Sequence, residues 1–175
     1  DTSNVTTVQF YNKQSFINPC MESSTRFVDK VISEVAAMHQ EAGAPLTTWH
    51  FGGDEAKNIK LGAGLQDINA EEKVSWKGNI DLSEQDKPFA QSPQCQTLIA
   101  DGTVSDFGHL PSHFAEEVSK MVAEKGIPNF QAWQDGLKYS EGEKAFATEN
   151  TRVNFWDVLY WGGTSSVYEW SKKGY

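Results

Sequence analysis

The 175-residue sequence lacks several features that would place it in common classes of protein. It has no run of about 18 consecutive apolar residues, so we predict no membrane-spanning helix in this segment. Basic residues are scarce, with 15 Lys and Arg against 24 Asp and Glu, and the net charge of −9 argues against a nucleic-acid partner, which requires a basic surface. No glycine-rich phosphate fingerprint follows an expected strand, so a dinucleotide-binding fold is unsupported.

The histidines do not indicate a metal site. His39, His109 and His113 lack metal-ligand spacing with Cys or carboxylate residues, so we predict neither a metal nor another cofactor. The sequence also opens on Asp1 without an initiator Met or a visible signal peptide. We interpret it as an excerpt from a longer protein, in which case the missing signal peptide says nothing about export.

The chain is rich in aromatic residues, which make up 12% and include six Trp. Such a surplus is typical either of sugar-stacking faces or of a large aromatic core. Phe27, Val31, Val35 and Met38 recur at helical spacing, and Phe114, Val118, Met121 and Val122 do so again. Strands and helices therefore alternate, which favours an α/β fold with a parallel sheet. The expected strands are 5–11, 46–51, 127–133 and 152–156, and the main expected helices are 23–41, 110–125 and 165–173.

The strand over 46–51 ends in an unusual way. Gly52 and Gly53 free the backbone for conformations closed to other residues, and Asp54 and Glu55 follow directly. Neighbouring side chains on a regular strand point to opposite faces, so the two carboxylates can share a pocket only if the strand breaks before them. The glycine pair supplies such a break.

Two carboxylates in one pocket push their pKa values apart, so one can stay protonated while the other stays charged. That pairing suits the cleavage of an acetal. Two other interpretations are open from the pair alone. Asp54 and Glu55 can be a solvated loop start, or they can be metal ligands if further carboxylates or His residues lie nearby.

The run from Trp49 to Ile59, which contains His-Phe-Gly-Gly-Asp-Glu, resembles the catalytic motif of glycoside hydrolase family 20, the β-N-acetylhexosaminidases, and its bacterial chitobiase branch in particular. Three other runs resemble that branch in the same order, so the resemblance covers essentially the whole chain. These runs are Ile17-Asn18-Pro19-Cys20, Gln131-Ala132-Trp133-Gln134-Asp135-Gly136 and the stretch from Val153 to Gly163.

The resemblance implies a (β/α)8 TIM barrel, in which catalytic residues lie at the carboxyl ends of the strands. On this basis residues 1–175 are a partial catalytic barrel domain that covers roughly the middle half, about units three to six. Residues 56–93, which are polar and weakly periodic, are then a long βα loop insertion.

Family 20 belongs to the substrate-assisted retaining class, in which the acetamido oxygen of the sugar attacks its own anomeric carbon. The resemblance implies that Glu55 is the general acid, and that Asp54 orients the acetamido N–H and stabilises the oxazolinium. Trp133 and Trp156 match positions that wall the sugar pocket, although packing in the barrel core would also explain them. Trp161 can stack on a second sugar or be structural.

His50 lies inside the expected strand, where a lone His is usually a core residue, and a supporting role near the carboxylates together with Gly52 and Gly53 is the alternative. The implied activity is exo-hydrolysis of terminal non-reducing β-linked N-acetylglucosamine from chitobiose and short chitin oligosaccharides. Two alternatives are hydrolysis of glycoconjugate glycans and non-catalytic sugar binding. The expected partner is thus a small carbohydrate.

In the implied barrel, Cys20 and Cys95 lie in loops of the same face, so we predict a disulfide between them. Two buried free thiols are the alternative. A disulfide requires an oxidising compartment. We therefore expect the full-length enzyme to be extracytoplasmic, whether periplasmic, attached to the outer membrane or secreted.

Overall fold

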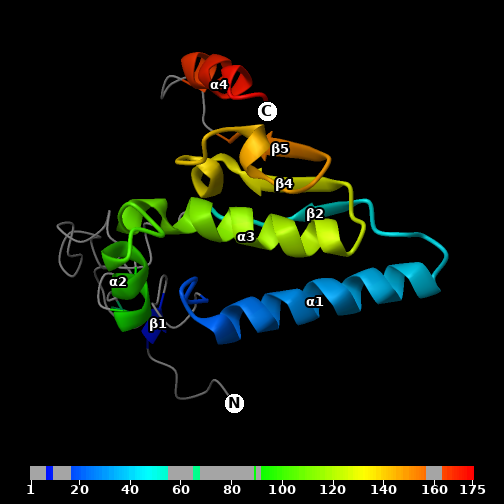
Figure 1. The fold of residues 1–175 in the computed structure, drawn as a ribbon, viewed down its shortest axis with the longest axis horizontal. Coiled ribbons are helices and arrows are strands. Elements are labelled where there is room, and N and C mark those ends of the chain that lie inside the picture. Colours follow the sequence, from blue (N-terminus) through cyan, green and yellow to red (C-terminus); the bar gives the residue numbers. More distant parts are fainter. Residues whose placement is uncertain (1–6, 10–16, 55–64, 68–88, 90–91, 157–162) are drawn as a thin grey trace.

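The computed structural model describes residues 7–9, 17–54, 65–67, 89, 92–156 and 163–175 (Figure 1). It has five strands and four α-helices among these residues, joined by short 3₁₀ turns. The strands are β1 Thr7–Gln9, β2 Thr48–His50, β3 Leu65–Asp67, β4 Asn129–Trp133 and β5 Asn150–Asn154, and the helices are α1 Glu22–Glu41, α2 Pro93–Ala100, α3 Leu110–Glu124 and α4 Gly163–Lys172.

Strands β2, β4 and β5 form one sheet in that order, and both pairings are parallel. Trp49 of β2 lies opposite Phe130 of β4, and Phe130 in turn lies opposite Thr151 of β5. The three strands run in the same direction, so their carboxyl ends meet at one edge of the sheet. The α/β arrangement with parallel strands is therefore confirmed.

The first strand does not join this sheet. Instead, β1 pairs antiparallel with β3, with Thr7 opposite Asp67. The described part of the chain thus places three strands in the parallel sheet, whereas four consecutive barrel units would require four. Most of the expected insertion over 56–93 lies outside the described residues, and β3 belongs to its described part.

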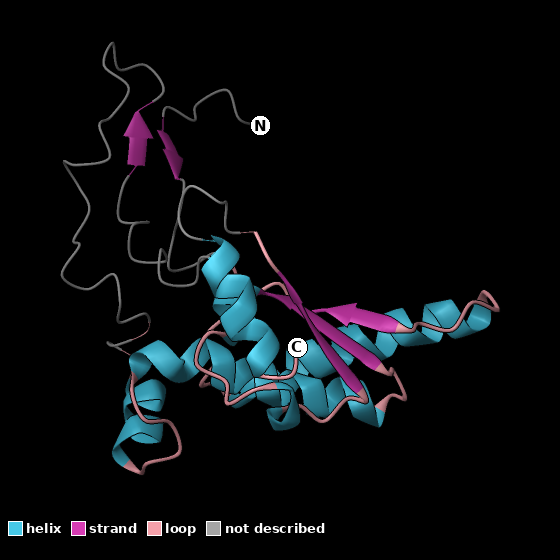
Figure 2. Cartoon of the chain, turned by 90° about the horizontal axis from the view of Figure 1, so that it is seen from above, coloured by secondary structure: helices cyan, strands magenta, loops and turns pink. Residues whose placement is uncertain are grey.

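The main core lies between the sheet and helices α1 and α3, which pack side by side (Figures 1 and 2). Burial alternates along β4, where Phe130 and Ala132 are buried and the residues between them are only partly covered. One face of the sheet therefore packs on the helices, and Gln131 and Trp133 lie on the other. Trp49 of β2 also packs against the core.

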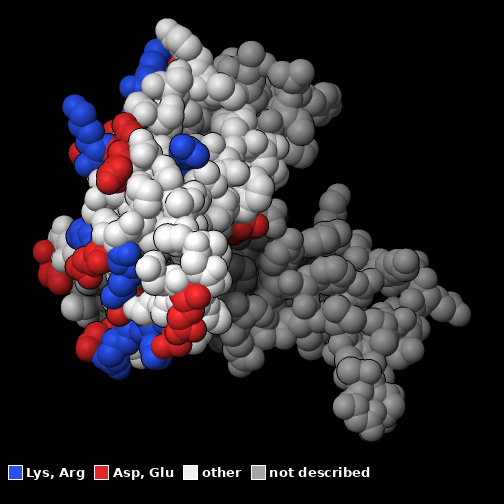
Figure 3. Space-filling view, turned by 90° about the vertical axis from the view of Figure 1, so that its right-hand side faces the viewer, with Lys and Arg blue, Asp and Glu red and all other residues white. Residues whose placement is uncertain are grey.

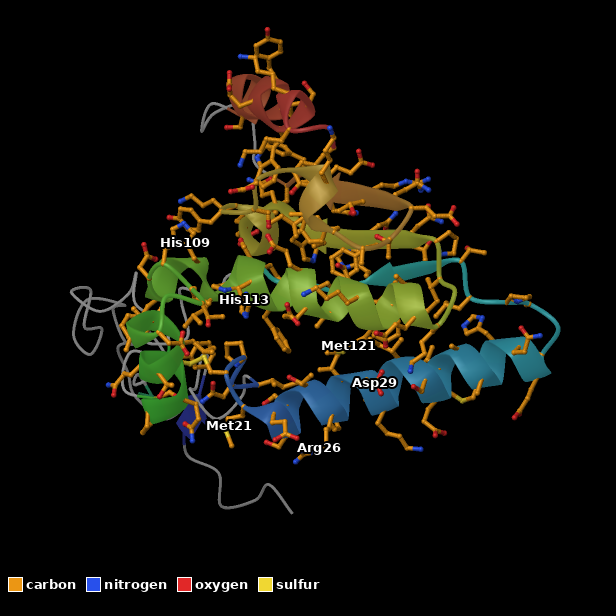
Figure 4. All side chains as sticks on the ribbon, in the orientation of Figure 1. Met21, Arg26, Asp29, His109, His113 and Met121 are labelled. Carbon is orange, nitrogen blue, oxygen red and sulfur yellow. A yellow bond between two sulfur atoms is a disulfide. The ribbon has the colours of Figure 1, made fainter. Side chains whose placement is uncertain are left out.

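The bounds of α1 agree with the sequence pattern, but the face chosen from the pattern is wrong. Phe27 and Met38 are each 59% exposed, and Ile32 is the fully buried residue, with Val28 and Ala36 packed beside it. The helix carries two apolar stripes, and the stripe with the smaller side chains lies on the core side. On α3 the expected stripe is correct, and Met121 points towards α1 (Figure 4).

A second, smaller core surrounds Cys95, Val104 and Leu110, which are buried together near α2 and the start of α3. The structure joins Cys20 to Cys95 through a disulfide, with an S–S distance of 2.02 Å and Cα atoms 5.1 Å apart. Asn18 donates a hydrogen bond from Nδ2 to Ser92 Oγ across the same region at 2.9 Å. The predicted pairing of the two cysteines is thus present, and it fastens the segment before α1 to α2.

The described charged side chains lie on helices and loops alike, and they mix both signs. On the face drawn in Figure 3, Lys and Arg residues stand next to Asp and Glu residues, mainly along the left and lower parts of the described surface. Ion pairs within single helices contribute to this mixing, as with Lys120 and Glu117 on α3 and Lys172 and Glu169 on α4. None of the described helices combines the length and apolar character needed to cross a membrane.

Candidate active site

The end of β2 changes direction at the two glycines. Its pairing with β4 continues past His50, because the Phe51 N–H donates to the Gln131 carbonyl at 2.7 Å and the Trp133 N–H donates to the Gly52 carbonyl at 2.9 Å. Gly52 and Gly53 then adopt φ values of 81° and 84°, which other residues rarely reach. The predicted break in the strand is therefore present, and Asp54 stands exposed in the turn beyond it.

Gly53 also makes a close backbone approach to the next loop. A Cβ atom added to Gly53 would lie 2.9 Å from the Cα atom of Gly136 and 2.9 Å from the ring of Phe51. A Cβ atom added to Gly136 would in turn lie 2.9 Å from the Cα atom of Gly53. The loops that follow β2 and β4 thus touch through their backbones, next to Asp54.

His50 is exposed at the end of β2 and is not a core residue. Its Nδ1 atom accepts a hydrogen bond from the Gly52 N–H at 3.0 Å, so the neutral ring carries its proton on Nε2. The ring also packs against Trp133, with centroids 5.3 Å apart and an interplanar angle of 63°. His50 therefore supports the glycine turn and the neighbouring tryptophan.

Two of the tryptophans that the structure describes, Trp133 and Trp156, lie at adjacent strand ends. Trp133 is the last residue of β4 and half-buried, and Trp156 lies two residues beyond the end of β5 with 40% of its surface exposed. Trp156 donates its backbone N–H to Gln134 Oε1 at 2.9 Å and its indole Nε1–H to Asp135 Oδ1 at 2.8 Å. Two consecutive residues after β4 thus hold one tryptophan after β5.

The buried side chain of Ser112, near the start of α3, holds the loop after β4 through two hydrogen bonds. Its hydroxyl donates to the Gly136 carbonyl at 3.2 Å and accepts from the Tyr139 N–H at 3.1 Å. The sequence alone gave no role to Gln134, Asp135 or Ser112. Only the tertiary structure reveals these three, because their partners are distant in sequence.

At the same end of α3, His109 forms a small polar cluster with neighbouring residues (Figure 4). Its Nδ1–H donates to Asp106 Oδ1 at 2.8 Å, and its ring packs on Tyr139 with centroids 4.4 Å apart. This hydrogen bond holds the pKa of the Asp106 carboxyl below its usual value. Near the chain end, burial raises the pKa of the Tyr175 hydroxyl.

Not every predicted site residue can be placed. Glu55 and Trp161 lie outside the described residues, so the structure gives no geometry for the carboxylate pair as a pair. Among the residues that are described, no three His, Cys, Asp or Glu side chains form a group that could hold a metal ion. The described part of the site is a turn bearing Asp54, with two tryptophans held at the next two strand ends.

Comparison with known proteins assigns the chain to a family. Residues 1–175 match the model of the glycosyl hydrolase family 20 catalytic domain over the whole chain, and the chain belongs to that family.

Among curated relatives, the chain is 95% identical over all 175 residues to an N,N'-diacetylchitobiase of Vibrio harveyi, of which it covers 20%. It is 29% identical to a beta-hexosaminidase of Vibrio vulnificus, with 100% of the chain and 17% of the relative covered. It is 32% identical to beta-hexosaminidase B of Pseudoalteromonas piscicida, with 78% of the chain and 14% of the relative covered. The chain thus spans a fifth or less of the length of these relatives.

Among solved structures, the chain resembles a family 20 exo-β-N-acetylglucosaminidase of Vibrio harveyi in complex with N-acetylglucosamine. The TM-score is 0.51 at 20% identity, and the match covers 83% of this chain and 17% of that one. At this identity the likeness shows the fold alone.

Proposed function

We propose that the full-length protein carrying this chain is an exo-acting β-N-acetylhexosaminidase that removes terminal non-reducing N-acetylglucosamine from chitobiose and short chitin oligosaccharides. The observation that carries this proposal is the 95% identity, over every residue of the chain, to an N,N'-diacetylchitobiase. In this proposal the sugar binds at the exposed turn that bears Asp54, between the two tryptophans.

We further propose that the chain is part of a closed (β/α)8 barrel, in the region of units three to six. Support comes from the three adjacent parallel strands, which, among the described residues, pack on α1 and α3 through one face. The opposite face, which bears Gln131 and Trp133, would line the barrel interior. Asp54, Trp133 and Trp156 would then share the catalytic edge.

In the proposed reaction the acetamido oxygen attacks the anomeric carbon while the bond to the leaving oxygen breaks. Glu55 donates its proton to that leaving oxygen. Asp54 accepts a hydrogen bond from the acetamido N–H and stabilises the positive oxazolinium. Water then attacks the anomeric carbon as Glu55 removes its proton, so the sugar is released with retained configuration and the acetamido group is restored. Trp133 and Trp156 exclude bulk water from the oxazolinium, and Trp161 is proposed to contact a second sugar.

Two variants in the full-length protein, each of which replaces a carboxyl group by an amide, test these roles. A general acid matters most for a poor leaving group, so Glu55→Gln should lose far more kcat/KM on chitobiose than on p-nitrophenyl N-acetylglucosaminide. General acid catalysis contributes about 10²–10⁴-fold, which sets the size of the gap. Asp54→Asn should lose similar activity on both substrates, because both need the acetamido group oriented.

Glu41→Gln, which removes a charge from the exposed end of α1, is the matched control and should leave both activities unchanged. Equal losses for Glu55→Gln on the two substrates would contradict its role as general acid. Wild-type activity on N-acetylgalactosaminides or glycoconjugates, without activity on chitobiose, would support the glycoconjugate alternative. Sugar binding without any turnover would indicate a non-catalytic domain.

We also propose that the full-length protein is extracytoplasmic, because the Cys20–Cys95 disulfide needs an oxidising compartment. Thiol titration of the protein after unfolding without reductant should find both cysteines blocked. Two free thiols in protein purified from its native compartment would argue against export on this ground.

A further inference from the structure

Trp156 is restrained at two points by one pair of residues. Its backbone N–H is held by Gln134 at 2.9 Å, and its indole Nε1–H is held by Asp135 at 2.8 Å. The first bond fixes the chain at the tryptophan, and the second fixes the direction of the ring. A ring that is 40% exposed would otherwise be free to occupy other rotamers.

The pair that holds Trp156 is itself fixed to the turn bearing Asp54. Gly136 follows Asp135 directly, and its backbone lies against Gly53 so closely that neither glycine has space for a Cβ atom. The buried Ser112 hydroxyl also donates to the Gly136 carbonyl. Asp135 therefore connects the position of the Trp156 ring to the backbone beside Asp54.

We infer that Asp135 is a positioning residue, which acts through the Trp156 indole to hold the wall of the sugar pocket at a set place relative to Asp54. This inference rests on the proposed function, because it takes the Trp156 ring as part of the sugar pocket. A carboxylate is a stronger acceptor for the indole N–H than a neutral oxygen, so an acid is well suited to this position.

A double-mutant cycle in the full-length protein tests this link. Asp135→Ala should weaken N-acetylglucosamine binding and lower kcat/KM on p-nitrophenyl N-acetylglucosaminide by about tenfold, the size expected for one lost hydrogen bond to a charged group. Asp135→Asn keeps an acceptor oxygen and should stay within about threefold of wild type. The number of sugar-binding sites per molecule should stay unchanged in both variants, whereas misfolding would reduce it.

Trp156→Phe keeps an aromatic ring but removes the indole N–H. In that background Asp135→Ala should cause less than about a twofold further loss, because the two residues act through one bond. Glu141→Ala, which removes an exposed carboxylate from the same loop, is the control and should behave as wild type. An undiminished loss from Asp135→Ala in the Trp156→Phe background, or no loss in the wild-type background, would overturn the inference. If Asp135→Ala does not fold, the same cycle with Asp135→Ser decides.

A direct readout keeps this inference separate from the proposed function. Hydrogen exchange of the Trp156 indole N–H, identified by its absence in Trp156→Phe, should speed up in Asp135→Ala and remain slow in Asp135→Asn. Unchanged exchange would overturn the positioning role even in an active enzyme. Wild-type protein that neither binds nor hydrolyses the sugar would contradict the proposed function, and the exchange measurement would still decide whether Asp135 holds the ring.

Discussion

The two clusters of buried residues in the described part of the chain are held together in different ways. The larger one, between the parallel sheet and helices α1 and α3, consists of ten buried residues, with Phe130 and Ile32 fully enclosed. The smaller one has three, Cys95, Val104 and Leu110, and it carries the disulfide. A cluster with so few buried apolar groups gains little from burial, so a covalent link contributes a larger share of its stability. The cluster beside the sheet is therefore stabilised mainly by packing of apolar side chains, and the cluster beside α2 mainly by the disulfide.

The largest expected effect comes from the sheet cluster. Phe130→Ala should lower the free energy of unfolding by about 3–5 kcal/mol, because it opens a cavity beneath the central strand. Phe107→Ala, a similar truncation of a partly buried ring beside the smaller cluster, should cost less than half as much, since the disulfide remains. Denaturant unfolding of both variants in the full-length protein measures the two costs, and equal costs would show that the clusters unfold as one unit.

The next effect comes from the crosslink. Replacing Cys20 and Cys95 together by Ser should cost about 2–4 kcal/mol, because the bond closes a loop with a sequence separation of 75. The loss should be local. Amide hydrogen exchange should rise in α2, while β4 keeps its protection. Equal acceleration in β4 would contradict the independence of the two clusters.

The smallest expected effect concerns the contact between loops. Gly53→Ala should cost about 1–3 kcal/mol more than Gly43→Ala, because both positions have positive φ but only Gly53 also meets the Gly136 backbone. The pair of variants separates backbone strain from crowding, and denaturant unfolding measures both.

Gly136→Ala supplies the complementary case, because its added Cβ atom would crowd Gly53 from the other side. It should reproduce the crowding cost, and it should reduce kcat/KM in the full-length protein by displacing the turn with Asp54. If Gly53→Ala and Gly43→Ala cost the same, the close approach of the two loops contributes nothing to stability.

Local patterns in the sequence predicted where helices and strands lie better than they predicted which elements pack or pair with one another. The spacing of apolar residues located α1 and α3 correctly, and the glycine pair located the end of β2. The face of α1 was misjudged, because a helix with two apolar stripes does not reveal which stripe meets the core. The pairing of β1 with β3 joins two segments far apart in the sequence, and no local pattern indicates it.

The residues of the candidate site that lie within a recognisable sequence motif could be named from the sequence. Asp54, Trp133 and Trp156 were all identified from runs that resemble family 20, and the structure places the two tryptophans at neighbouring strand ends. The roles of Asp135 and Ser112 were missed, because an Asp in a loop or a Ser in a helix is common and becomes informative only through a distant partner. The burial expected for His50 was also wrong, since its side chain lies on the exposed edge.

The mutual contact of Gly53 and Gly136 has a consequence for altering this protein by design. The distance between the two loops is set by peptide groups, so it does not depend on the side chains of the proposed sugar pocket. A library that varies Trp133 and Trp156 to admit differently substituted sugars would therefore leave the spacing of the loops intact. Because neither Gly53 nor Gly136 has space for a Cβ atom, a library should keep both glycines. The positions around the proposed pocket thus divide into side chains that can be redesigned and a backbone contact that must be kept.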